Sequence, residues 1–86
     1  MRSVEIIKNP LVTEKAISAM EEENKLLFIV DLEANKNQIA GAFEELYEVE
    51  VEKVNTLIDS EGRKKAYIKL TPDYSADELA TDIGIF

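Results

Sequence analysis

The sequence predicts an α+β fold, a single-domain sandwich of helices on a mostly antiparallel four-stranded sheet, in the order β-α-β-α-β-β-α. Apolar residues recur at helical spacing in three segments, and four other segments are rich in β-branched and aliphatic residues. A tight-turn signal joins the last two of these strand segments. The chain has 86 residues and is 45% hydrophobic, which suffices for one modest core. We therefore expect one domain over residues 1–86.

The first strand is predicted from the apolar run from Val4 to Ile7, which ends at a turn around Pro10. A helix is then expected after Thr13, whose hydroxyl can cap the first turn. Three consecutive Glu residues oppose the helix dipole and predict that this helix ends near Asn24. Its apolar face is predicted to consist of Ala16, Ile17 and Met20.

The second strand is predicted from the continuous apolar run from Leu26 to Val30, which is typical of a strand covered on both faces. Asn35 and Gln38 resemble a capping box and predict the start of the second helix. Gly41 lies inside this helix, where it costs about 1 kcal/mol relative to Ala, and we expect it to permit close packing on the sheet. The predicted apolar stripe is Ile39, Phe43, Leu46 and Tyr47, while Glu44, Glu45 and Glu48 are expected to face away.

The segment from Val51 to Leu70 predicts a β-hairpin around Ser60-Glu61-Gly62, because Gly62 can adopt the left-handed conformation that such a loop needs. If Asp59 and Arg63 close the loop, the antiparallel register follows. The predicted pairs on the mainly apolar face are Val54 with Ile68 and Thr56 with Ala66, and on the opposite face Asn55 with Tyr67 and Lys53 with Lys69.

The last helix is predicted after a break at Pro72, where Ser75 and Glu78 form a capping-box pattern. Gly84 is expected just beyond the end of this helix. Ile85 and Phe86 should then pack back as a hydrophobic tail.

The chain contains neither Cys nor His, which removes the nucleophile systems and zinc sites that depend on them. The acidic runs lack the loop pattern of a Ca²⁺ or Mg²⁺ site and are expected to be solvated helix faces. Asp59 and Glu61 flank a tight turn rather than a cleft. We therefore expect no enzyme activity, no cofactor and no metal.

The net charge of −8 is spread unevenly along the chain. Residues 1–20 carry a net charge of +1 and residues 60–72 carry +3, whereas residues 21–59 carry −8 and residues 73–86 carry −4. The basic charge is thus concentrated near the hairpin. One face of the hairpin carries lysine, asparagine and tyrosine side chains, which are suited to contact phosphates and exposed bases. The alternative is a solvated sheet face whose edge lysines discourage aggregation.

The N-terminus lacks a signal-peptide pattern, and no apolar run approaches the roughly 20 residues that span a bilayer. We therefore expect a cytoplasmic protein without membrane insertion.

Four stretches together resemble the ribosomal protein L23 family of the large subunit, in order and over nearly the whole chain. They are Pro10 to Ala16, Asn24 to Ile39, Val51 to Leu70 and Asp73 to Phe86. The most specific stretch is the hairpin, with V-N-T-L-I followed by K-K-A-Y.

The resemblance implies an rRNA-binding protein at the peptide-exit tunnel, beside ribosomal protein L29. It also implies a share in the platform where signal recognition particle and nascent-chain chaperones dock, with Glu14 as the docking residue. The implied rRNA-binding residues are Lys8, Lys15, Lys36, Lys53, Asn55, Thr56, Arg63, Lys64, Lys65, Tyr67 and Lys69.

The short hairpin loop differs from the long tunnel loop of bacterial members, and the basic extension of eukaryotic members is missing. The archaeal type therefore fits best, although the acidity departs from a typically basic family. The rival interpretation is a free α+β regulatory or protein-interaction module. The cluster of Arg63, Lys64, Lys65 and Lys69 argues against it, because a ligand-binding module would not need that cluster.

Overall fold

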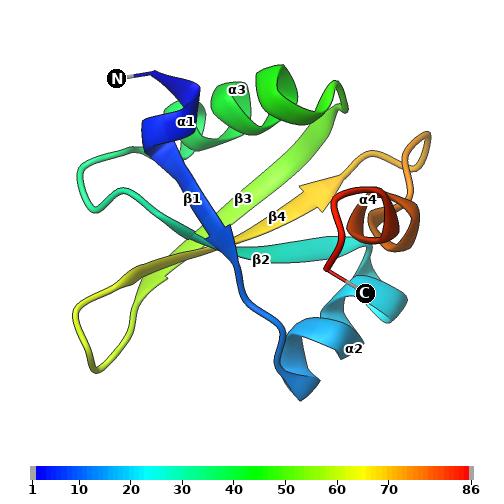
Figure 1. Cartoon of the computed structure of the whole chain (residues 1–86), viewed down its shortest axis with the longest axis horizontal. Coiled ribbons are helices and arrows are strands. Elements are labelled where there is room, and N and C mark those ends of the chain that lie inside the picture. The colour runs from blue at the N-terminus through cyan, green and yellow to red at the C-terminus, as the bar shows by residue number, and fades with distance from the viewer. Residues whose placement is uncertain (1, 86) are drawn as a thin grey trace.

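The fold places helices on both sides of a four-stranded sheet, as a computed structural model of residues 2–85 shows (Figure 1). In chain order the elements are α1 (Ser3–Ile6), β1 (Ile7–Pro10), α2 (Glu14–Glu23), β2 (Lys25–Val30), α3 (Lys36–Tyr47), β3 (Val51–Ile58), β4 (Lys64–Leu70) and α4 (Ala76–Asp82). The predicted α+β class with a four-stranded sheet is confirmed, and every strand pair is antiparallel.

The strand order is β1-β2-β4-β3, which the sequence left open. Helix α3 carries the chain from β2 to β3, and β4 then folds back into the gap between these two strands. As a result β2 and β4 are the inner strands, while β1 and β3 are the edges. This arrangement sets the basic residues of β4 between those of β2 and β3.

The hairpin register is confirmed. Lys53 pairs with Lys69, and Asn55 pairs with Tyr67. The Asp59 N–H donates to the Arg63 carbonyl at 2.9 Å and closes the loop. Gly62 has a φ of 79°, the left-handed conformation expected of it.

The prediction of a strand from Val4 was wrong, because residues 3–6 form one turn of helix and β1 begins at Ile7. The Arg2 carbonyl accepts hydrogen bonds from the N–H groups of Glu5 and Ile6, at 2.9 and 3.2 Å. Ile6 is thereby turned into the core, where it is buried. A run of four residues is too short for periodicity to separate a strand from a buried helical turn.

The predicted helix starts are confirmed: Thr13 and Ser75 accept hydrogen bonds from the N–H three residues on, and Asn35 forms a complete capping box with Gln38. Helix α2 ends at Glu23, which confirms the predicted end near Asn24, and Asn24 caps it in the left-handed conformation.

Two predictions for α3 were wrong. A Cβ added at the exposed Gly41 would meet no atom within 4 Å, so this glycine permits no close packing. Glu44 does not face away, because its carboxylate accepts a hydrogen bond from the Val51 N–H at 2.9 Å. Glu44 therefore fixes the point at which the chain turns from α3 into β3.

The main core lies between α3 and one face of the sheet. Phe28 of β2 meets Phe43 of α3 edge to face, with ring centroids 5.2 Å apart, and Tyr47 completes the aromatic cluster. The largest fully buried side chains are Phe28, Phe43, Ile39, Ile68 and Leu70. Ile85 packs partly against this core, as predicted, whereas Phe86 lies outside the described residues.

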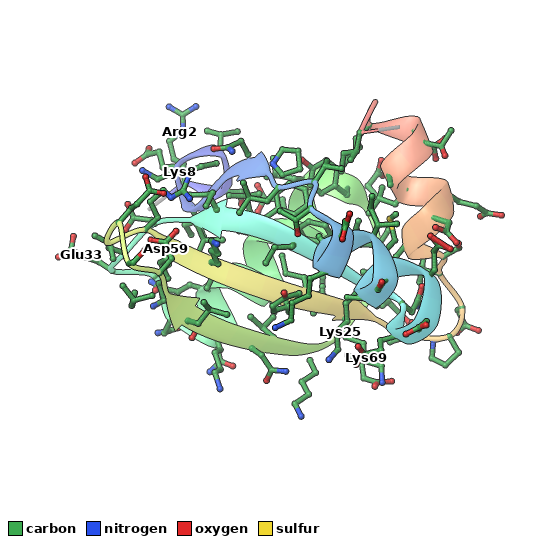
Figure 2. The ribbon with its side chains drawn as sticks, turned by 90° about the horizontal axis from the view of Figure 1, so that it is seen from below. Arg2, Lys8, Lys25, Glu33, Asp59 and Lys69 are labelled. Atoms are coloured by element: carbon green, nitrogen blue, oxygen red, sulfur yellow. The ribbon has the colours of Figure 1, made fainter. Side chains whose placement is uncertain are left out.

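Helix α2 lies over the opposite face of the sheet, but only at one end (Figure 2). It buries Leu27 and leaves the β3 and β4 side chains of that face uncovered. Within residues 2–85, none of the helices combines the length and the apolar character that a membrane span requires.

Candidate nucleic-acid interface

The uncovered sheet surface consists of six side chains, three from each strand of the hairpin, and we call it the open face. Side chains that lie directly opposite in an antiparallel pair point to the same face, so the register defines the set. These side chains are Lys53, Asn55 and Leu57 from β3, with Lys69, Tyr67 and Lys65 opposite them on β4. The open face thus carries three ammonium groups, one amide and one aromatic ring.

A row of three lysines crosses one end of this face. Lys69 pairs with Lys25 of β2 on one side and with Lys53 of β3 on the other. Neighbouring strands lie about 4.8 Å apart, so the three positive charges are close together. Glu23 offsets Lys25 at 3.1 Å and Glu52 offsets Lys69 at 3.4 Å.

Lys53 differs from the other two lysines of this row in having no carboxylate partner within residues 2–85. It is exposed, and none of the ion pairs within residues 2–85 involves it. An exposed ammonium without an internal carboxylate has the least to lose when it binds a phosphate.

Tyr67 lies in the middle of the open face along β4, paired with Leu27 of β2 on one side and with Asn55 of β3 on the other. Both Tyr67 and Asn55 are half-buried, so each presents part of its side chain to solvent. An aromatic ring beside an amide is the combination that proteins use to stack and read an unpaired base.

The hairpin loop holds its own basic groups in place. The Asp59 carboxylate accepts hydrogen bonds at 2.9 Å from the Arg63 N–H, the Glu61 N–H and the Arg63 guanidinium. The bond from the Arg63 N–H is the largest of the effects that hold the pKa of Asp59 below its ordinary value of 3.8. Lys65 approaches the same carboxylate at 3.6 Å. Arg63 and Lys65 are therefore partly neutralised within the loop.

Lys64 points to the α3 side of the sheet. Its ammonium donates to the Ala34 carbonyl at 2.7 Å and lies 3.4 Å from the Leu32 carbonyl. These contacts attach the hairpin to the loop that precedes α3. The Lys64 charge thus serves the fold, and it is separated from the open face by the sheet.

The other predicted residues fall into four places. Lys8 lines a shallow hollow with Arg63 and Lys64 at the hairpin end, and Figure 2 shows Lys8 and Asp59 at that end. Lys15 of α2 lines a hollow that it shares with Tyr67. Thr56 pairs with Ala66 and lies on the α3 side of the sheet, which also holds Lys36 at the start of α3. Glu14 is exposed at the start of α2.

The structure thus brings together Lys53, Asn55, Lys65, Tyr67 and Lys69, with Lys15 at the margin. It does not bring Lys36, Thr56 or Lys64 to this surface. No group of three His, Cys, Asp or Glu side chains able to hold a metal ion was found in residues 2–85.

Sequence reasoning missed Lys25, and it predicted that Asp59 closes the loop but not the role of the Asp59 carboxylate. Lys25 begins β2 and joins the lysine row only because β4 inserts beside β2. The Asp59 carboxylate organises the loop, and the position of Asp59 at the start of a short turn, where Asp commonly bonds the backbone two residues on, was a signal for this role.

The open face offers ammonium groups, an amide and an aromatic ring on a flat support, which fits a polyanion that exposes bases. The family model described as Ribosomal protein L23 matches residues 5–78. That match runs from α1 through the hairpin and into α4, so it contains the whole open face. The chain therefore belongs to the ribosomal protein L23 family.

Proposed function

We propose that this ribosomal protein binds large-subunit rRNA through its open face, near the peptide-exit tunnel. Membership of the L23 family supports a structural role in the large ribosomal subunit rather than an enzymatic activity. The single observation that carries the proposal is the lysine row, in which Lys53, Lys69 and Lys25 lie side by side next to Tyr67. The long-range field of a chain with a net charge of −8 opposes RNA, so contact depends on this local cluster.

The proposal extends to the neighbours that the family resemblance implies. We place the protein beside ribosomal protein L29, in the cytoplasm, on a platform that receives signal recognition particle and nascent-chain chaperones. The loop of Ser60, Glu61 and Gly62 is short, which supports an archaeal type. The free interaction module is disfavoured because the family is a ribosomal one.

The test is binding of the purified protein to large-subunit rRNA fragments across a salt series, with bulk RNA as competitor. Each phosphate contact contributes about 0.7 to 0.9 to the slope of log K against log salt. Lys53→Gln should therefore lower the magnitude of that slope by the contribution of about one phosphate contact, and it should weaken binding. Selective retention of one fragment under competition would support the ribosomal assignment and locate its site.

Lys36→Gln is the matched control, because Lys36 is also exposed, makes no ion pair within residues 2–85 and lies on the other side of the sheet. It should leave the slope unchanged. Equal losses in the two variants would refute the assignment to the open face. Simultaneous replacement of Arg63, Lys64 and Lys65 is a poor test, because it would also break the contacts with Asp59 and Ala34.

Glu14 gives a separate test of factor docking. Its side chain is exposed at the first turn of α2. Glu14→Ala should preserve assembly into the subunit and weaken binding of signal recognition particle to the assembled ribosome. Unchanged docking would remove Glu14 from the docking site.

A further inference from the structure

A hollow lies between α2 and the open face, with a volume of about 240 Å³. This is several times the share of one water molecule in the liquid, about 30 Å³, so the hollow can admit a larger group. Its lining residues are Lys15, Ser18, Ala19, Glu23, Lys25 and Tyr67. It arises because α2 covers Leu27 and then stops short of the centre of the sheet.

Apart from the Glu23–Lys25 ion pair, the polar side chains in and beside this hollow are not engaged by other residues of the described chain. No hydrogen bond within residues 2–85 engages the side chains of Tyr67, Asn55 or Ser18. Lys15 makes no ion pair there either. An aromatic hydroxyl, an amide and a serine hydroxyl are therefore free to bind a ligand in or beside the hollow.

The charged side chains around the hollow indicate where a neutral group and where a phosphate would bind. Glu23 lines it with its carboxylate 3.1 Å from the Lys25 ammonium, so the charge of Lys25 is already offset inside the hollow. The same carboxylate accepts hydrogen bonds and therefore favours a neutral group that carries N–H donors. Lys15 and Lys53 flank the hollow and the face without internal carboxylate partners, so phosphates fit at the margins.

We propose that this hollow receives one unpaired base of the bound RNA, stacked on Tyr67, with its flanking phosphates on Lys15 and Lys53. This inference rests on the proposed rRNA binding and specifies what the open face recognises. Glu23 selects a base with an exocyclic amino group, so adenine, cytosine and guanine bind better than uracil, which has none. Asn55, directly across from Tyr67, contacts the base edge.

The experiment measures binding of fluorescent hexaadenylate, hexauridylate and a blunt RNA duplex at low salt. Hexaadenylate should bind the wild-type protein more tightly than hexauridylate. Loss of a stacking ring weakens single-strand binding by roughly five-fold to a hundred-fold, so Tyr67→Leu should do this for hexaadenylate and leave duplex binding unchanged. Tyr67→Phe keeps the ring and should retain most of the affinity. Glu23→Gln should narrow the difference between the two hexanucleotides.

The outcomes distinguish the hollow from the wider proposal. Salt-dependent RNA binding that is insensitive to Tyr67→Leu, with equal affinity for both hexanucleotides, would overturn the base site and leave the open face as a phosphate surface. Absence of binding to rRNA fragments, hexanucleotides and duplex at every salt concentration would overturn both. Urea unfolding of Tyr67→Leu and Tyr67→Phe shows whether each variant is folded. If Tyr67→Leu does not fold, wild-type affinity for hexaadenylate in an Asn55→Ala, Glu23→Gln double variant would overturn the base site.

Discussion

Asn24 holds together the end of α2, the end of β4 and the start of α4. Its side-chain amide N–H groups point at three carbonyls, those of Tyr74 at 2.9 Å, Leu70 at 3.3 Å and Thr71 at 3.4 Å. Its side-chain oxygen accepts a hydrogen bond from the Ala76 N–H at 2.8 Å. Its backbone is left-handed, with a φ of 58°. One residue thus supplies a helix end and a junction between segments far apart in the sequence.

The effect of removing the side chain can be worked out from these contacts. The two short bonds, to Tyr74 and from Ala76, are worth about 0.5 to 1.5 kcal/mol each. Ala76 is fully buried, so its N–H is poorly placed to find water instead. We expect Asn24→Gly to destabilise the protein by about 1–3 kcal/mol through the lost hydrogen bonds. Asn24→Ala should cost about 1 kcal/mol more, because a Cβ is unfavourable in the left-handed conformation.

The assay is urea unfolding followed by circular dichroism, with the two variants compared in the same buffer. The wild-type protein should be the most stable, Asn24→Gly less stable, and Asn24→Ala the least stable. Asn24→Asp serves as a further control, because it keeps the acceptor for Ala76 but turns a carboxylate toward three carbonyls, and it should also be destabilised. An Asn24→Gly variant as stable as the wild type would refute the reasoning, since it would show that the side-chain contacts contribute nothing.

Three other predictions follow from single side chains. Gly41→Ala should stabilise the protein by about 0.5–1 kcal/mol, because the added Cβ meets no atom and the helix gains propensity; a lower urea midpoint would contradict this. Phe43→Ala should destabilise it by about 3–5 kcal/mol, enough to approach the whole stability of a small domain; thermal unfolding measures the loss, and a shift within error would show that the aromatic cluster does not support the core. The depressed pKa of Asp59 means that its carboxylate stabilises the folded hairpin fully above pH 3.8 and loses this effect as the pH falls through the folded pKa. Asp59→Asn should therefore remove part of the acid sensitivity seen in an unfolding titration, and an unchanged acid profile would argue against this role.

Local signals in the sequence were enough to predict the helix starts and the hairpin. A cap at Thr13 or Asn35 depends on residues three positions away, and the register from Asp59 to Lys53 depends on a short loop closed at Gly62. These interactions are close in sequence, so residue type and spacing determine them. The same local reasoning failed at Val4, where a short apolar run formed a helical turn.

The sequence by itself determined the α+β class, the hairpin register and the chemistry available on the open face, namely lysines, an amide and a tyrosine. Only the tertiary structure decided that β4 inserts between β2 and β3, which adds Lys25 to the row of Lys69 and Lys53. It also decided that Lys64 turns to the opposite side and that α2 leaves a hollow beside Tyr67. The physical reason is that strand order is set by burial of the core face shared with α3. Contacts between segments distant in the chain decide that burial, and no local pattern of residues encodes them.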